Sequence, residues 1–245
     1  MRGSSALRAA WRRLSAGEYA RQWTARAGDG ALGFAAPIVS RWVPTQTKTV
    51  STLIPPPKSL GEVTHVDLLN KEDSEAIEGI WREYHEGKSG RMGARVHPDT
   101  YGAFRDRSTS CPMFVMPLHK SPSKFLTLVV QAKMPYASFT AIDDFRKLQE
   151  AAPPMMVAAH YPELVESKDM VLVQAAHVDA DTAGAAEHLT AQEALRLIRL
   201  CHKFYADDAL YEKFVKPFNH AQKNFDFDAF TAEVAKVTWS DDVIR

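Results

Sequence analysis

The sequence predicts an α+β domain in which an antiparallel or mixed central sheet carries flanking helices. Three observations support this fold class. Apolar residues recur at helical spacing near both ends of the folded region, short apolar runs typical of strands fill its centre, and turn-forming residues separate these runs. Helices, then strands, then helices along one chain are typical of the α+β class.

The composition narrows the class of protein. The chain of 245 residues is 45% hydrophobic and 24% charged, with a formal net charge of zero. Because the chain has no excess of positive charge to attract phosphate groups, we expect no nucleic-acid partner. The longest apolar stretches fall far short of the ~20 residues that a spanning helix needs, so we expect no membrane span. Two cysteines, Cys111 and Cys201, are too few for a disulfide scaffold and indicate buried thiols in a reducing compartment.

The N-terminal segment has its own chemistry. Residues 1–34 contain six arginines, no lysine and two acidic residues. Leu7, Trp11 and Leu14 recur at helical spacing, whereas Arg8 and Arg12 point elsewhere, as in a basic amphipathic helix. We therefore predict a mitochondrial transit peptide over residues 1–34, with a disordered basic tail as the alternative.

A proline-rich segment follows. Residues 35–58 contain Pro37, Pro44 and a run of three prolines at 55–57. Proline fixes its own φ angle and biases the residue before it away from helix. This segment is therefore predicted to be an extended linker, and the folded domain to begin near Leu60.

Two helices are predicted next. Asn70 is expected to cap the first, and the helix is expected to end near Gly87, with the glycines up to Gly93 forming a loop. The second covers 98–107, with Pro98 in its first turn. The residues that these two helices are expected to bury are Ala76, Ile77, Ile80, Trp81, Tyr84, Tyr101 and Phe104.

Short apolar runs rich in Val, Phe, Leu and Thr then predict the strands. The runs 113–118 and 125–134 suggest an antiparallel hairpin, and Phe139 with Thr140 ends another short strand. A helix is expected over 142–148. Two further strands are predicted at 155–161 and 170–178, joined by a charged turn at 163–169.

The clearest helix start is a capping box, in which Thr190 and Glu193 each satisfy a free backbone N–H. Two terminal helices are predicted around 209–218 and 227–237. We accordingly divide the folded part into an α+β domain over residues 59–207 and a C-terminal helical extension over residues 208–245.

The sequence offers few residues in catalytic or metal-binding patterns, so we expect no enzyme activity, no cofactor and no metal. His160 and His177 are candidates to face each other on neighbouring strands near Asp179, which would permit acid-base or metal chemistry. The alternative is that both are ordinary strand histidines. Cys111 precedes a strand, and we interpret it as a buried inert thiol because no basic neighbour is apparent in the sequence.

Methionines beside prolines suggest a binding surface. Met134, Met155 and Met156, together with Pro135 and Tyr136, are predicted at strand ends. Methionine adapts to an irregular apolar partner, so these five residues are our candidate partner-binding site. Ordinary core packing is the alternative reading of the same residues.

Several segments resemble the ATP synthase F1 assembly factor family that chaperones the beta subunit. They are 77–85 (IEGIWREYH), 111–118 (CPMFVMPL), 138–140 (SFT), 160–164 (HYPEL), 168–173 (KDMVLV) and 203–205 (KFY). Their order and spacing agree with the family. The likeness extends from Leu60 to Asp207, and more weakly to Val237.

The resemblance implies a soluble protein of the mitochondrial matrix with a sheet and flanking helices. It implies a chaperone that binds the unassembled beta subunit of F1 until alpha takes its place, with no catalytic residues and no small-molecule substrate. Two other functions stay open. One is a permanent structural subunit of the ATP synthase or of another mitochondrial complex, and the other is a small hydrolase that uses His160, His177 and Asp179.

Overall fold

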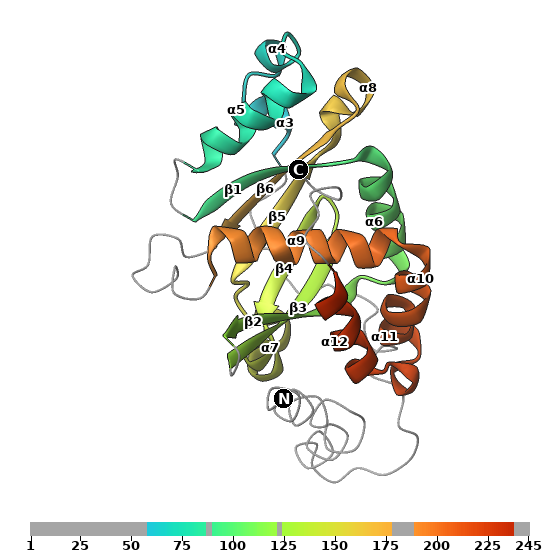
Figure 1. The fold of residues 1–245 in the computed structure, drawn as a ribbon. Coiled ribbons are helices and arrows are strands. Elements are labelled where there is room, and N and C mark those ends of the chain that lie inside the picture. Colours follow the sequence, from blue (N-terminus) through green and yellow to red (C-terminus); the bar gives the residue numbers. More distant parts are fainter. Residues whose placement is uncertain (1–57, 87–89, 122–123, 178–188, 238–245) are drawn as a thin grey trace, which may run out of the picture.

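The computed structural model describes residues 58–86, 90–121, 124–177 and 189–237. Its centre is one six-stranded sheet with the order β1-β6-β5-β4-β3-β2, in which every neighbouring pair is antiparallel (Figure 1). Its strands are β1 (Arg91–Val96), β2 (Met113–Ser121), β3 (Lys124–Lys133), β4 (Tyr136–Ala141), β5 (Met156–Tyr161) and β6 (Val171–His177). The predicted α+β class with flanking helices is confirmed.

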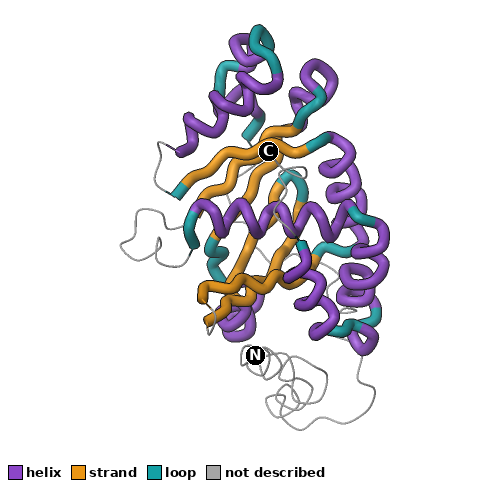
Figure 2. The backbone as a smooth tube through the Cα atoms, in the orientation of Figure 1, coloured by secondary structure: helices purple, strands orange, loops and turns teal. Residues whose placement is uncertain are grey.

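Helices flank this sheet. Helix α9 crosses one face, with α6, α11 and α12 beside it, and α5 lies along β1 (Figure 2). The α-helices are α3 (Leu60–Val63), α4 (Val66–Leu69), α5 (Ser74–Glu86), α6 (Pro98–Ser110), α7 (Ile142–Leu148), α8 (Val165–Lys168), α9 (Ala191–Ala206), α10 (Asp208–Leu210), α11 (Lys216–His220) and α12 (Phe227–Lys236). Short 3-10 turns form η3 (Gln149–Ala151), η4 (Pro162–Leu164) and η7 (Gln222–Asn224), and η6 (Tyr211–Val215) is a π-helix.

The larger hydrophobic core lies between the sheet and helices α6, α9 and α12. Phe114 of β2 meets Phe230 of α12 edge to face, with 5.1 Å between the ring centroids, and Phe204 of α9 lies 5.1 Å from the same ring of Phe230. All three rings are fully buried. The described part of the predicted C-terminal extension over 208–245, residues 208–237, therefore shares one core with the sheet.

A smaller core lies on the opposite face. Leu172 of β6 belongs to it, while its neighbours Val171 and Val173 point into the larger core, because successive strand residues alternate between faces. Helix α5 packs here through Ile77 and Trp81, and the indole Nε1 of Trp81 donates a hydrogen bond to the carbonyl oxygen of Val173 at 2.9 Å. The N-terminal helices thus cover the β1 and β6 end of the sheet.

Strand β1 corrects the predicted glycine loop. Residues 87–89 lie outside the described chain, but Gly93 belongs to β1 and pairs with Gln174 of β6. A Cβ atom at Gly93 would lie 2.7 Å from both the Cδ1 atom and the carbonyl oxygen of Trp81. Glycine is required because helix and strand approach closely here, and the residue therefore belongs to a strand and not to a loop.

Two helix predictions are also corrected. Asn70 does not cap α5, because it ends the short helix α4, which buried Leu69 holds in place. The carboxylate of Asp73 accepts a hydrogen bond from the Ala76 N–H at 2.8 Å, just before α5.

The segment 163–169, predicted as a charged turn, is mostly helical. It contains the end of η4 and all of α8, and α8 ends at Asp169, which has the left-handed conformation with φ 53°.

Ile80 and Tyr84 of α5, which were expected to be buried, are 46% and 44% exposed, whereas two other local predictions are confirmed. Strands β2 and β3 form the expected hairpin, with Leu118 opposite Leu126. The Thr190 hydroxyl accepts from the Glu193 N–H at 3.2 Å, and the Glu193 carboxylate accepts from the Thr190 N–H at 2.8 Å, which completes the capping box of α9. The predicted transit peptide over 1–34 and linker over 35–58 lie outside the described residues, apart from Lys58.

Candidate functional site

Three of the five predicted partner-binding residues lie together at one end of the sheet. Met134 and Pro135 connect β3 to β4, and Tyr136 begins β4. All three side chains are half-buried. The turn is fastened to β5, because the N–H of His160 donates to the carbonyl oxygen of Pro135 at 3.0 Å. Met134, Pro135 and Tyr136 therefore form a continuous surface, which we call the β3–β4 turn.

The other two predicted residues lie at the opposite end of β5. Tyr136 pairs with Ala159, whereas Met156 pairs with Phe139, three residues further along. This separation corresponds to roughly 10 Å along the strand. Met156 is fully buried in the larger core, and Met155 is half-buried and packs against that core. The structure thus splits the predicted set into two groups.

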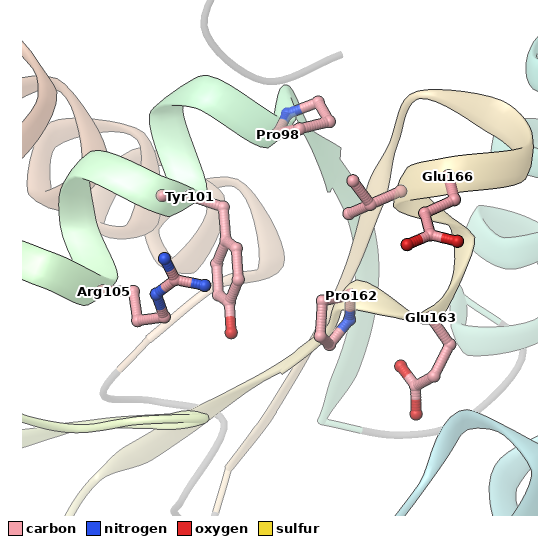
Figure 3. A pocket seen from close by; sticks show the side chains of 8 residues that line it. Pro98, Tyr101, Arg105, Pro162, Glu163 and Glu166 are labelled. Carbon is pink, nitrogen blue, oxygen red and sulfur yellow. The ribbon is translucent and has the colours of Figure 1, made fainter.

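A pocket opens at the same end of the sheet as the β3–β4 turn. It has a volume of about 460 Å³ and lies between α6 on one side and η4 with α8 on the other (Figure 3). The lining residues that Figure 3 labels are Pro98, Tyr101, Arg105, Pro162, Glu163 and Glu166. From the sequence, Tyr101 is predicted only as a buried helix residue, and the segment 160–164 carries only a family resemblance.

The charged residues of the pocket differ in how they are paired. The Arg105 guanidinium is bound by the carboxylate of its neighbour Asp106 at 2.8 Å. One oxygen of Glu163 accepts the backbone N–H of Leu60 at 2.6 Å, which anchors the start of α3. Glu166 is exposed and makes no ion pair or hydrogen bond with any residue in the described part of the chain. Negative charge is therefore in excess at this pocket.

Tyr101 forms the inner wall of the pocket. Its side chain is only 7% exposed, and its ring stacks on His160 with 5.5 Å between centroids and 30° between planes. Burial raises the pKa of the Tyr101 hydroxyl above its ordinary value, and the charge of Glu163 adds to the rise against the opposing effect of Arg105. The hydroxyl is therefore neutral at physiological pH.

A buried histidine pair lies behind Tyr101. The Nδ1 atom of His160 is 2.9 Å from the carbonyl oxygen of Pro135, and its Nε2 atom is 2.9 Å from Nε2 of His202. A carbonyl oxygen only accepts, so His160 carries its proton on Nδ1, and His202 must donate from Nε2. Burial lowers the pKa of His160 to about 4, and burial with repulsion from His160 lowers the pKa of His202 well below its ordinary value. Both imidazoles are therefore neutral.

The predicted pairing of His160 with His177 is wrong. In the antiparallel register His160 lies opposite Val173, whereas His177 lies opposite Met156 at the far end of β5. Asp179 lies outside the described residues. The two strands therefore do not bring together the histidines of the hydrolase hypothesis, because His160 and His177 lie at opposite ends of the β5–β6 strand pair.

Cys111 is fully buried, as predicted, but the expectation that it lacks a basic neighbour is wrong. Its sulfur lies 3.2 Å from the hydroxyl of Tyr211 and 3.4 Å from Nε2 of His220. Both partners come from the C-terminal helices, about a hundred residues further along the chain. Sequence spacing carries no signal for such a contact.

The described residues contain neither a candidate membrane span nor a candidate metal site. No helix among them is both long and apolar enough to cross a membrane. No cluster of three or more histidine, cysteine, aspartate or glutamate side chains within the same ranges is arranged to hold a metal ion.

Comparisons with known proteins give a consistent result. The sequence is similar to the proteins named ATP synthase mitochondrial F1 complex assembly factor 1 from Danio rerio, Mus musculus and Homo sapiens, with 25%, 27% and 28% identity over 178, 179 and 178 residues. Each alignment covers 72% of this chain and 56%, 52% and 52% of the relative, so the chain spans about half the length of these curated relatives.

A family model covers more of the chain than these pairwise alignments do. The model described as "ATP11 protein" matches residues 37–231, which include all six strands of the sheet, the β3–β4 turn and both walls of the pocket. Because this match extends over most of the sequence, the chain belongs to the ATP11 protein family.

Proposed function

We propose that this protein is an assembly chaperone for the F1 part of the mitochondrial ATP synthase, and that its client is the unassembled beta subunit. The observation that carries the proposal is the family match over residues 37–231, together with three similar proteins that are named as F1 complex assembly factors. In this proposal the protein acts by binding another polypeptide and catalyses no reaction. It works in the mitochondrial matrix, with residues 1–34 as its transit peptide.

The mechanism follows from the problem that a free beta subunit poses. A subunit of a permanent complex exposes apolar surface that its neighbour later covers, and such surface aggregates. A chaperone must cover that surface and release it again. A half-buried, adaptable contact suits this task better than a rigid one, since methionine side chains repack around irregular partners.

We place the client contact at the β3–β4 turn. Met134, Pro135 and Tyr136 are half-buried and lie at a sheet end, whereas Met156 lies inside the core, where it supports β4 and β5. Met155 lies at the other end of β5, in the second of the two groups. In this proposal the client is held by Met134, Pro135 and Tyr136, and Met155 contributes less.

Retention of the beta subunit tests this proposal with a matched pair of variants. The full chain, immobilised, is incubated with isolated beta subunit, and the retained amount is measured. Met134→Asp is expected to lower retention about tenfold or more, because a carboxylate is placed in an apolar contact. Met155→Asp is the control, since Met155 is equally half-buried and also packs against the larger core. Circular dichroism checks that both variants fold.

Two outcomes contradict the proposal in different ways. If the unchanged chain retains no beta subunit, the client is wrong. If both variants retain the subunit as well as the unchanged chain does, the contact surface is wrong while the client stands. Stoichiometric recovery of the protein in purified, fully assembled synthase would instead identify it as a permanent structural subunit.

A further inference from the structure

The geometry of the pocket between α6 and η4 with α8 points to a specific ligand: we propose that it binds a basic side chain, lysine or arginine, from a segment of a polypeptide partner in which an apolar residue lies beside the basic one. This inference rests on the proposed function for the identity of the partner. It deepens that function, because it names the kind of residue in the client that the chaperone recognises.

The size of the pocket suits a side chain with part of its neighbour. A volume of about 460 Å³ lies within the range of roughly 300–1,000 Å³ that is usual for small-ligand sites. Pro98, Pro162 and Val165 make its walls partly apolar. Lysine and arginine bury their aliphatic stems along apolar surface while keeping the charge near polar groups, so such walls fit the stem of a basic side chain.

Tyr101 supplies an unpartnered polar group inside the pocket. The residue is only 7% exposed, and its hydroxyl makes no hydrogen bond with another residue of the described ranges. Figure 3 shows the hydroxyl reaching into the space between the two walls. A neutral phenol oxygen accepts a hydrogen bond from an ammonium or guanidinium group, and the ring attracts a cation.

The balance of charge selects a cation over an anion. Glu163 and Glu166 lie on the wall opposite Tyr101 and Arg105 (Figure 3). Arg105 is already paired with Asp106 at 2.8 Å, whereas Glu166 has no charged partner in the part of the chain that the structure describes. An anionic ligand would have to take Arg105 from Asp106 and approach two carboxylates. A basic side chain meets unpaired negative charge.

The pocket is connected to the proposed client contact through one side chain. Tyr101 stacks on His160, and Nδ1 of His160 donates to the carbonyl oxygen of Pro135 in the β3–β4 turn at 2.9 Å. A bound segment that covers the β3–β4 turn therefore lies near the pocket. Its apolar residues meet the turn, and a neighbouring basic residue enters the pocket.

Short peptides test the pocket without any beta subunit. The probe is an acetylated and amidated pentapeptide with a central arginine between two leucines and a glycine at each end, with analogues carrying glutamine or glutamate at the centre. Binding to the full chain is followed by NMR shifts of the backbone amides of Gly102 and Val165, which line the pocket. We expect the glutamine peptide to bind about tenfold more weakly than the arginine peptide, and the glutamate peptide more weakly still.

Two variants assign the effect to the pocket. Glu166→Gln is expected to weaken binding of the arginine peptide about fivefold, because it removes the unpaired carboxylate. Tyr101→Phe keeps the ring and removes only the hydroxyl, with an expected loss of about threefold. The matched control is Glu83→Gln, which makes the same charge change at an exposed residue of α5, away from the pocket.

Equal binding of the arginine and glutamine peptides would overturn the proposal, as would tighter binding of the glutamate peptide or equal effects of Glu166→Gln and Glu83→Gln. The two proposals fail separately. Peptide binding at the pocket without retention of the beta subunit leaves the pocket assignment intact and removes the client. Retention of the beta subunit without arginine-dependent peptide binding removes only the pocket assignment.

Discussion

The side chain of Asn219 hydrogen-bonds both backbone groups of Met113, from which it is separated by 106 residues. Its Oδ1 atom accepts the Met113 N–H at 3.2 Å, and its Nδ2 atom donates to the Met113 carbonyl oxygen at 2.6 Å and to that of Val215 at 2.9 Å. Met113 begins β2, which is one of the two edge strands of the sheet. The side-chain amide of Asn219 thus satisfies the backbone N–H and C=O of Met113 at the sheet edge. Without it, these groups would be free to pair with another strand.

We expect Asn219→Ala to lower the free energy of unfolding by about 2 kcal/mol, because it leaves the backbone groups of Met113 without these partners. Asn219 is only 5% exposed, so water replaces it poorly. Urea denaturation measures the change. Asn224→Ala, at an exposed residue of η7, is the control and is expected to change stability by less than about 0.5 kcal/mol. Similar losses in both variants would contradict the role given to Asn219.

Gly93→Ala is expected to destabilise the protein by about 1–3 kcal/mol, because the new methyl group would lie 2.7 Å from Trp81 and force α5 away from β1. Gly79→Ala is the matched control within α5, where an added Cβ meets no atom within 4 Å. That change is expected to stabilise the helix by roughly 0.5–1 kcal/mol. Thermal unfolding of both variants compares them, and a neutral effect at Gly93 would show that α5 and β1 adjust without cost.

The buried histidine pair makes the protein sensitive to acid. The folded-state pKa of His160, about 4, lies below that of an unfolded histidine, near 6.5, so its contribution to stability is complete above pH 6.5 and is lost as the pH falls toward 4. Between pH 6.5 and pH 5 this residue alone is expected to lower the free energy of unfolding by about 2 kcal/mol. Denaturant titrations across this range measure the slope.

Two variants separate the pair from other groups. His202→Leu removes one buried imidazole and is expected to make the dependence on pH shallower. His65→Gln, at an exposed position, is expected to leave the slope unchanged. A slope in the unchanged protein that persists undiminished in His202→Leu would assign the acid sensitivity to other residues.

Neither thiol of the native protein is expected to react with Ellman's reagent on the timescale on which the unfolded chain reacts completely. Cys111 and Cys201 are 0% and 2% exposed, and burial raises the pKa of Cys201 well above its ordinary value. His220→Ala is expected to leave Cys111 equally slow to react, because the thiol itself is fully buried and the change removes a basic neighbour of the sulfur. The Cys111→Ser variant identifies which thiol reacts, and fast labelling of Cys111 in the unchanged protein would contradict its burial.

Much of the fold is predictable from the sequence because the relevant signals are local. The capping box of Thr190 and Glu193, the helix over 142–148 and the hairpin of β2 and β3 all depend on residues a few positions apart, and the structure confirms each. Strand β1 is one exception. In the sequence alone, Gly93 indicates a loop. The structure shows that Trp81 of α5 packs against it, and this contact explains why the strand residue must be glycine.

The candidate site is less predictable. The adaptable residues Met134, Pro135 and Tyr136 are recognisable from composition, but the sequence groups them with Met156, which the fold buries. The pocket leaves no sequence signal, since Tyr101 and Glu166 come from elements about sixty positions apart.

The sequence by itself determined the α+β class, most of the strands and helices, and the family resemblance. Periodicity, helix caps and short motifs each depend on residues that are close together in the sequence. Only the tertiary structure decided that His160 meets His202 instead of His177, that Asn219 closes the edge at Met113, and that a pocket with excess negative charge opens beside Tyr101. These contacts depend on strand register and on which faces pack together. Both are set by the burial of the whole core, and no local stretch of residues contains them.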